Sequence, residues 1–193
     1  MTKDAVVMVS QYIAHIQTIT SRATDLMEAA VLNLGKVEAG EPFNIIAENA
    51  KLEGTVRTFD AKTHDIVETE MKRYAERTAA MYGGTVKFKY HRLLDSVINE
   101  TQSAQLVQSI ARNSFGEDSV GDFPPTMGGK DFGEYTNYIN SAFATVGTRN
   151  ISKGSDYPHH HAFFNVVEES LKVSAELYGQ YALSYIYIKM NFN

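Results

Sequence analysis

Three consecutive histidines form the part of the sequence best suited to chemistry. His159, His160 and His161 follow Pro158, and two phenylalanines and an acidic pair come after them. Imidazole is the commonest protein ligand for zinc and related divalent metals. Side chains of adjacent residues project in different directions, so at most one or two of the three could reach one metal ion. The alternative is a solvated loop that binds no metal. The three histidines alone do not decide between a metal site and such a loop.

The composition is that of an ordinary globular protein. The chain has 193 residues, of which 44% are hydrophobic and 21% charged. The net charge is -5 and the lysines and arginines are scattered, which argues against nucleic acid or an anionic membrane as a partner. No apolar run is long enough to span a bilayer, and the first twenty residues lack the pattern of a signal peptide. Without cysteine there are no disulfides, and a cytoplasmic location is the default expectation.

The first half of the chain alternates between helical and strand patterns. Apolar spacing and turn residues predict helices over residues 4–20 and 63–82 and strands over residues 29–37, 50–60 and 85–90. This order is that of a ferredoxin-like βαββαβ sandwich that lacks its first strand. The first strand normally lies inside the sheet, so its absence would leave a gap, and the sequence looks truncated.

The second half predicts part of an α/β sheet. Three helices are expected: one over residues 101–115, one that starts near Lys130 or Asp131, and one over residues 166–186. Strands are expected near residues 119–123 and 141–147, and an irregular loop over residues 148–162. The change in character near residue 97 predicts two domains, residues 1–97 and residues 98–193.

Four separated segments together resemble one family. They are DAVVMVSQYIAHIQTITSR (4–22), PFNIIAENAKLEGTVRTFD (42–60), TMGGKDF (126–132) and PHHHAFFNVVEE (158–169). Their order and spacing resemble the metal-dependent amidohydrolases, in the N-acyl-amino-acid amidohydrolase and hippurate hydrolase branch of the aminoacylase–carboxypeptidase superfamily. The resemblance implies that residues 1–97 are an incomplete ferredoxin-like lid and dimerisation domain. Residues 98–193 would then be the C-terminal portion of a catalytic α/β domain.

The resemblance also implies a metal site that this chain completes only in part. The family uses two divalent ions (zinc, manganese, cobalt or nickel) and a glutamate as general base. Four metal ligands and that glutamate belong to motifs absent from this sequence, so we expect no catalytic residue here and at most one metal ligand. Counting back from Phe164 and Glu168 in the family's H-H-P-x-F-x-x-x-E pattern places that ligand at His160. We expect His159 and His161 to lie beside the site or to face solvent, and Ala162 replaces the family proline.

Two residues match the family's substrate-binding positions. Asn44 and Arg57 match a lid asparagine and arginine that bind the substrate carboxylate or its carbonyl end, a role that suits a bidentate guanidinium and a directional amide. The alternative is a turn residue and a solvated strand residue. In the Gly-Gly-Glu-Asp-Phe motif Lys130 replaces the glutamate, and Asp131 is expected to cap the helix that follows.

Three functions remain open at this point. The first is that the chain is part of a hydrolase that cleaves N-acyl amino acids and is inactive as this chain alone. Such a chain is expected to form a homodimer through the face containing residues 4–22 and an exposed strand of the lid. A separate N-terminal half is a possible partner. The second is a non-catalytic split or degenerate fragment that acts as a dimerisation and ligand-binding module. The third is a stand-alone metal-binding or small-molecule-sensing domain built on the first half.

Overall fold

The computed structural model describes residues 3–192, which divide into two compact units. Within the described residues, unit 1 contains residues 3–96 and 126–129, and unit 2 contains residues 97–125 and 130–192. The elements of unit 1 are α1 (Ala5–Ile16), α2 (Ile19–Arg22), β1 (Ala30–Ala39), β2 (Ala50–Thr58) and α3 (Ala61–Met81). Those of unit 2 are α4 (Thr101–Phe115), η1 (Glu117–Ser119), α5 (Phe132–Thr136), η2 (Ile151–Lys153) and α6 (Glu169–Phe192).

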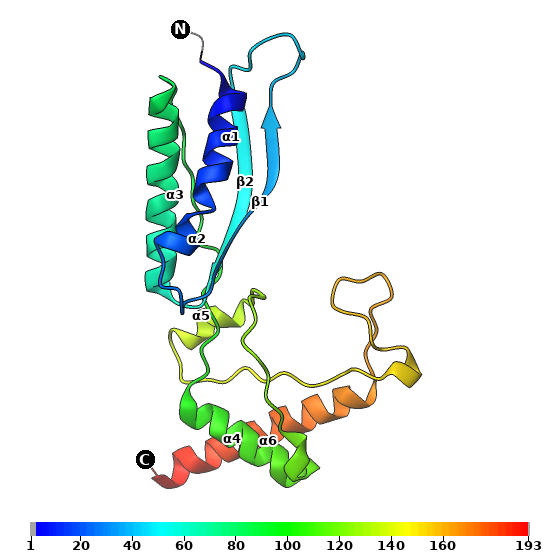
Figure 1. Cartoon of the computed structure of the whole chain (residues 1–193). Helices are drawn as coiled ribbons and strands as arrows, with labels where there is room; N and C mark the ends of the chain where they lie inside the picture. The colour runs from blue at the N-terminus through cyan, green and yellow to red at the C-terminus, as the bar shows by residue number, and fades with distance from the viewer. Residues whose placement is uncertain (1–2, 193) are drawn as a thin grey trace. The chain divides into compact units, whose positions relative to one another are not determined.

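Unit 1 is an antiparallel hairpin covered by helices. Strands β1 and β2 pair from Ala30 opposite Thr58 to Ala39 opposite Ala50, with a bulge at Gly35. A side chain at Gly54 would lie 2.4 Å from the Asn33 carbonyl oxygen, so glycine permits the close approach beside the bulge. Helices α1 and α3 pack against each other and against β2 (Figure 1).

The core of unit 1 lies between the helices and the hairpin. Ile16, Ile19 and Val67 are fully buried, and Tyr12 and Ala75 join them. The strands contribute half-buried side chains at alternate positions, as expected of a sheet with one face toward the core: Leu32, Leu34, Leu52 and Val56. Burial raises the pKa of Tyr12 to about 12.

The predicted helices of unit 1 are confirmed with small changes. Asp4 caps α1 as predicted, its carboxylate accepting from the backbone N–H of Val6 at 2.9 Å. The helix expected over residues 4–20 is two helices, because α1 ends at Ile16 and α2 starts at Ile19. Helix α3 ends before Gly83, which has a φ of +68° that favours glycine.

Three predicted strands are wrong within the described residues. Residues 85–90, 119–123 and 141–147 form no strand, and the only sheet of residues 3–192 is the β1–β2 pair. A strand exists only when a neighbour pairs with its backbone, and these segments have no such neighbour in the described chain.

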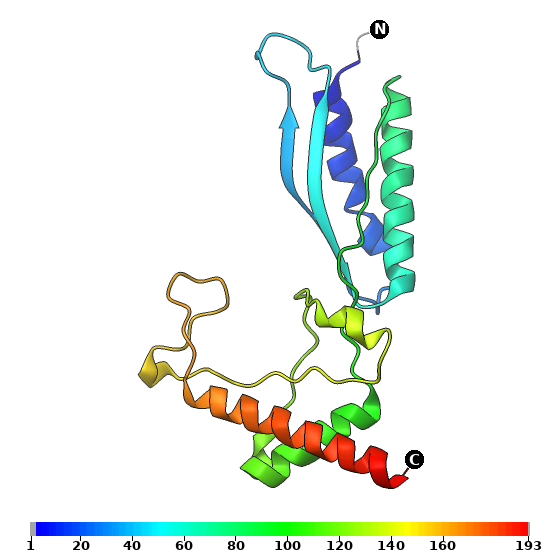
Figure 2. The ribbon, with the colours of Figure 1, turned by 180° about the vertical axis from the view of Figure 1, so that it is seen from behind.

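Unit 2 is built mainly on the packing of α4 against α6, which lie side by side in both views (Figures 1 and 2). Helix α4 matches its predicted bounds, and the carboxylate of Glu100 caps its first turn. Helix α6 starts three residues later than expected and continues to Phe192. The loop expected over 148–162 contains η2 and a short bridge between Asn150 and Ser155. No helix among residues 3–192 is long and apolar enough to cross a membrane.

Candidate functional site

The histidine loop connects η2 to α6 in unit 2 through a chain of tight turns. The backbone N–H of His161 donates to the carbonyl of Pro158 at 3.2 Å, and that of Phe164 donates to the carbonyl of His161 at 3.0 Å. Each bond closes a turn of four residues, so the three imidazoles project from a folded backbone and not from an extended one.

The two outer imidazoles are held by aromatic neighbours. The ring of His161 stacks on Tyr157 with centroids 4.4 Å apart, and the ring of His159 meets Phe164 edge to face at 4.9 Å. The Nδ1 atom of His161 also accepts a hydrogen bond of 3.1 Å from the backbone N–H of Phe163. His161 therefore has one ring nitrogen occupied within its own loop.

His160 differs from both neighbours. Its φ is +67°, in the left-handed region that favours glycine, and it is the only non-glycine residue in the described chain with a positive φ. Its side chain is exposed, and no ring contact or hydrogen bond joins the imidazole to another described residue. Holding a non-glycine residue there costs about 1–3 kcal/mol, a strain that is concentrated at functional sites. Of the three imidazoles, only that of His160 makes neither a ring contact nor a hydrogen bond with another described residue.

The described residues do not form a complete metal site. No group of three or more histidines, aspartates or glutamates among residues 3–192 is arranged to hold a metal ion. A free neutral imidazole is a suitable donor for zinc and similar ions, so His160 fits as one ligand of a larger set.

Arg57 lies near the end of β2, opposite Val31. Its Nη1 donates a hydrogen bond of 2.6 Å to the backbone carbonyl of Met127. The structure thus brings together two of the segments singled out in the sequence, 42–60 and 126–132.

Asn44 lies elsewhere in unit 1. It is exposed and lies in the loop that joins β1 to β2. Figure 1 shows this loop at the opposite end of the hairpin from the start of α3. Arg57 lies seven residue steps after Ala50 along β2, a length of about 23 Å at about 3.3 Å per step. The structure therefore does not bring Asn44 and Arg57 to one place within a chain.

The Gly-Gly segment before α5 lies close to Leu94 within unit 1. A side chain at Gly129 would lie 3.1 Å from Cδ1 of Leu94, closer than most such contacts.

The expected cap of α5 is wrong in one respect. Asp131 occupies the N-cap position, but its backbone is helical and its side chain makes no capping hydrogen bond. The carboxylate of an N-cap residue normally reaches the helix N–H groups from an extended backbone. Lys130 beside it is exposed.

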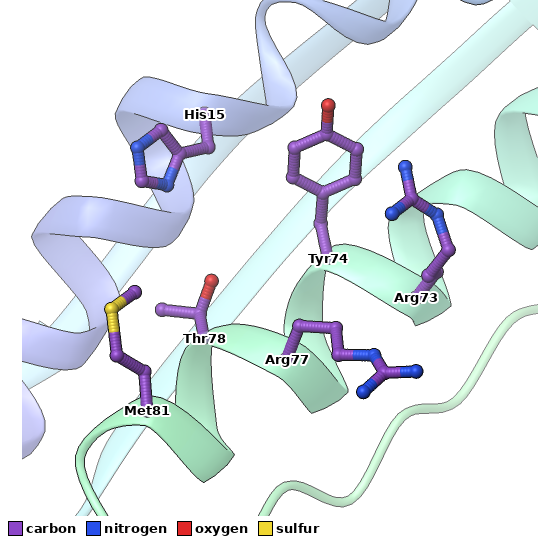
Figure 3. A pocket seen from close by; sticks show the side chains of 6 residues that line it. All are labelled: His15, Arg73, Tyr74, Arg77, Thr78 and Met81. Carbon is purple, nitrogen blue, oxygen red and sulfur yellow. The ribbon is translucent and has the colours of Figure 1, made fainter.

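A groove that the sequence did not reveal lies between α1 and α3 (Figure 3). It has a volume of about 280 Å³ and is lined by His15, Arg73, Tyr74, Arg77, Thr78 and Met81. Arg73 is bound to Glu70 and lies over the ring of Tyr74, 4.8 Å from its centroid. In Figure 3 both guanidinium groups lie away from His15, so the groove does not gather its cationic groups on one point.

Comparison with known proteins identifies the family. The profile of peptidase family M20/M25/M40 matches residues 5–184. N-acetylcysteine deacetylase of Bacillus subtilis is 32% identical over 180 residues, and N-acetyldiaminopimelate deacetylase of Listeria welshimeri is 31% identical over 177. These alignments cover 93% and 92% of this chain but 46% of each relative.

A solved structure agrees with these relatives. The crystal structure of a dinuclear metal-binding M20 peptidase from Bacillus subtilis superposes with a TM-score of 0.77 at 29% identity, over 94% of this chain and 46% of that one. The chain therefore spans about half the length of the proteins it matches. These matches confirm the amidohydrolase resemblance inferred from the four segments.

Proposed function

The chain belongs to peptidase family M20/M25/M40, and we propose that it forms part of a metal-dependent hydrolase that cleaves the amide bond of N-acyl amino acids. Two relatives are named as deacetylases of N-acetylated amino acids, and a structural neighbour is described as a dinuclear metal-binding peptidase. Divalent ions, when bound, would supply Lewis-acid activation of water and of the amide carbonyl.

The observation that supports a metal-ligand role for His160 is its free imidazole on a strained backbone. His159 and His161 are packed on Phe164 and Tyr157, whereas His160 has no such neighbour and a φ of +67°. The family pattern selects the same residue by counting from Phe164 and Glu168. We therefore assign His160 as one metal ligand, and His159 and His161 as residues that shape the loop.

We assign substrate binding to Arg57 and Asn44. The guanidinium of Arg57 has further N–H groups beyond the one that binds Met127, and these suit a carboxylate. About 23 Å of strand separates Ala50 from Arg57, and Asn44 lies in the loop before Ala50. The two side chains are therefore too far apart to contact one N-acyl amino acid. Asn44 would therefore serve the substrate of a second copy of the chain, in agreement with the homodimer expected of a lid domain.

Unit 2 supports the proposal that the chain works together with further polypeptide. It exposes large apolar side chains that a larger domain would cover, among them Phe123, Tyr138, Leu183, Tyr187 and Met190. We propose that residues 1–193 alone do not hydrolyse N-acyl amino acids, since a single imidazole cannot position a metal ion for catalysis.

The experiment compares the chain alone with the chain supplied with the part of a relative that it does not span. Hydrolysis of N-acetyl amino acids and of hippurate is measured with added zinc, manganese, cobalt or nickel. The part of the Bacillus subtilis N-acetylcysteine deacetylase outside the aligned region is then added as a separate polypeptide. We expect no turnover without it and metal-dependent turnover with it. Turnover that follows the chain alone through purification and disappears in His160→Ala would refute the assignment of inactivity.

A further inference from the structure

The two ends of the histidine loop meet at one backbone oxygen. The carbonyl of Thr148 accepts a hydrogen bond of 3.1 Å from the hydroxyl of Ser155 and another of 3.4 Å from the backbone N–H of Val167. A carbonyl oxygen has two lone pairs and can accept both bonds. Figures 1 and 2 show the segment between η2 and α6, drawn in orange, as a loop whose ends lie side by side. Residues 156–166, which include the three histidines, therefore form an arc that is closed at its base.

Ser155 lies at the centre of this base. Its side chain is 3% exposed, whereas all other residues from 151 to 165 are exposed. The backbone N–H of Asn150 is shared between the carbonyl and the hydroxyl of Ser155, each at 3.0 Å. The backbone N–H of Ser155 donates in return to the carbonyl of Asn150 at 3.0 Å. The hydroxyl thus both donates and accepts in a buried place, where the loss of a partner is costly.

A second link at the base is weaker. The ammonium of Lys153 forms an ion pair with the carboxylate of Glu169 at the start of α6, and its hydrogen bond lowers the pKa of Glu169. Both side chains are at least half exposed, and exposed ion pairs contribute little to stability because water and salt screen them. The buried hydroxyl of Ser155 is therefore the side-chain group that closes the loop most firmly.

The closed base restricts the arc that carries His160. A chain segment with both ends fixed has fewer conformations than one with a free end. His160 has a φ of +67°, and a non-glycine residue keeps such a backbone only where the surrounding structure imposes it. The tight turns that Pro158 and His161 form within the arc are local, and the bonds to Thr148 are what return the arc to its starting point. The conformation of His160 should therefore depend on the closure at Ser155.

We propose that Ser155 is a positioning residue for His160: its hydroxyl closes the arc and thereby holds the imidazole on the left-handed backbone from which it would bind a metal ion. That this imidazole binds a metal rests on the proposed function; the hydrogen bonds of Ser155 and the conformation of His160 do not. Ser155 acts through the backbone of the arc and supplies no ligand itself. Loss of residues that orient a metal ligand typically weakens metal binding about 10–100-fold.

Two variants of the full chain test whether Ser155 holds His160. Ser155→Ala removes the hydroxyl. Ser152→Ala is the matched control, because Ser152 is an exposed serine of the same segment whose hydroxyl donates to the side chain of Asn150. A residue with a positive φ gives a strong NOE between its own amide and α protons. We expect this NOE at His160 in the unchanged chain and in Ser152→Ala, and its loss in Ser155→Ala.

Amide exchange in α4 and α6 shows whether unit 2 stays folded in each variant. The exchange rates should be the same in all of them. If Ser155→Ala unfolds the unit, Ser155→Cys takes its place, because it nearly keeps the volume of the side chain and forms only weak hydrogen bonds. The same loss of the NOE is then expected.

Zinc affinity separates positioning from a merely structural role. It is measured on the chain combined with the part of the Bacillus subtilis N-acetylcysteine deacetylase outside the aligned region. Ser155→Ala should weaken zinc binding about tenfold, and Ser152→Ala should leave it unchanged.

Three results would overturn the proposal: an NOE at His160 that is absent from the unchanged chain, one that persists in Ser155→Ala, or an unchanged zinc affinity of the folded variant. If the combined protein binds no zinc even with Ser155 in place, the proposed function fails. The NOE then decides by itself whether Ser155 positions His160.

Discussion

The guanidinium of Arg57 donates from Nη1 to the backbone carbonyl of Met127 at 2.6 Å, across seventy positions of sequence. This bond ties the end of β2 to the Gly-Gly segment that precedes α5. Arg57, which we propose to bind substrate, therefore also holds the glycine-containing segment 126–129 in place. Substrate binding and positioning of this segment can be measured separately.

Arg57→Ala should release the segment 126–129. Hydrogen bonds to charged groups contribute about 1.5–3 kcal/mol, and exposure of Arg57 brings the expected loss of unfolding free energy nearer to 1 kcal/mol. Amide exchange of residues 126–129 should become faster, whereas Arg77→Ala should leave it unchanged. Arg77 is an exposed arginine of α3 for which the described residues provide no hydrogen-bond partner. Equal exchange rates in both variants would show that the bond to Met127 does not hold the segment.

The three histidines should differ in their effect on metal binding. In the chain combined with the part of the Bacillus subtilis N-acetylcysteine deacetylase outside the aligned region, His160→Ala should abolish activity and lower the bound metal. His159→Ala and His161→Ala should keep most of both, and each should lose about 0.5–1.5 kcal/mol of aromatic contact. Metal content by mass spectrometry and activity of the three variants decide between them. If His161→Ala is the inactive variant and His160→Ala keeps its metal, the register is wrong by one residue.

The strain at His160 predicts a stabilising substitution. Glycine adopts a φ of +67° without the steric cost that a Cβ atom brings, about 1–2 kcal/mol. His160→Gly should therefore unfold at a higher temperature than His160→Ala, although both lack the imidazole. The matched control is His159→Gly against His159→Ala, where no positive φ is relieved and glycine should be the less stable of the pair. A His160→Gly variant that is no more stable than His160→Ala would mean that the left-handed conformation is not kept in solution.

The helices could be predicted from the sequence because their signals are local. The apolar spacing over residues 63–82 and the glycines at 83 and 84 predict α3, and the pattern over residues 101–115 predicts α4. Residues 85–90 carry an equally clear strand pattern, yet they form no strand. Pairing is a property of two segments, and the sequence of one segment does not show whether its partner is present.

The candidate site could be predicted only in part. His160 was selected by its place in the family pattern. The sequence does not indicate its left-handed backbone, because a positive φ is uncommon in every residue other than glycine, histidine included. The bond from Arg57 to Met127 could not be predicted, because its partners are seventy residues apart and one of them is a backbone carbonyl. The separation of Asn44 from Arg57 could not be predicted either, because it depends on how β1 and β2 pair in the hairpin.

The exposed edge of β1 predicts a homodimer. Val31 and Val37 are 44% and 48% exposed on this strand, and its outer backbone groups have no partner strand among the described residues. Light scattering at tens of micromolar should give about twice the chain mass of 21.5 kDa. Lysine at both valines should shift the protein toward the monomer by charge repulsion across the paired edges. Met81→Lys, at an exposed position on the end of α3, should leave the dimer intact. A monomeric wild-type chain, or a dimer dissociated by Met81→Lys but not by the valine changes, would place the interface elsewhere.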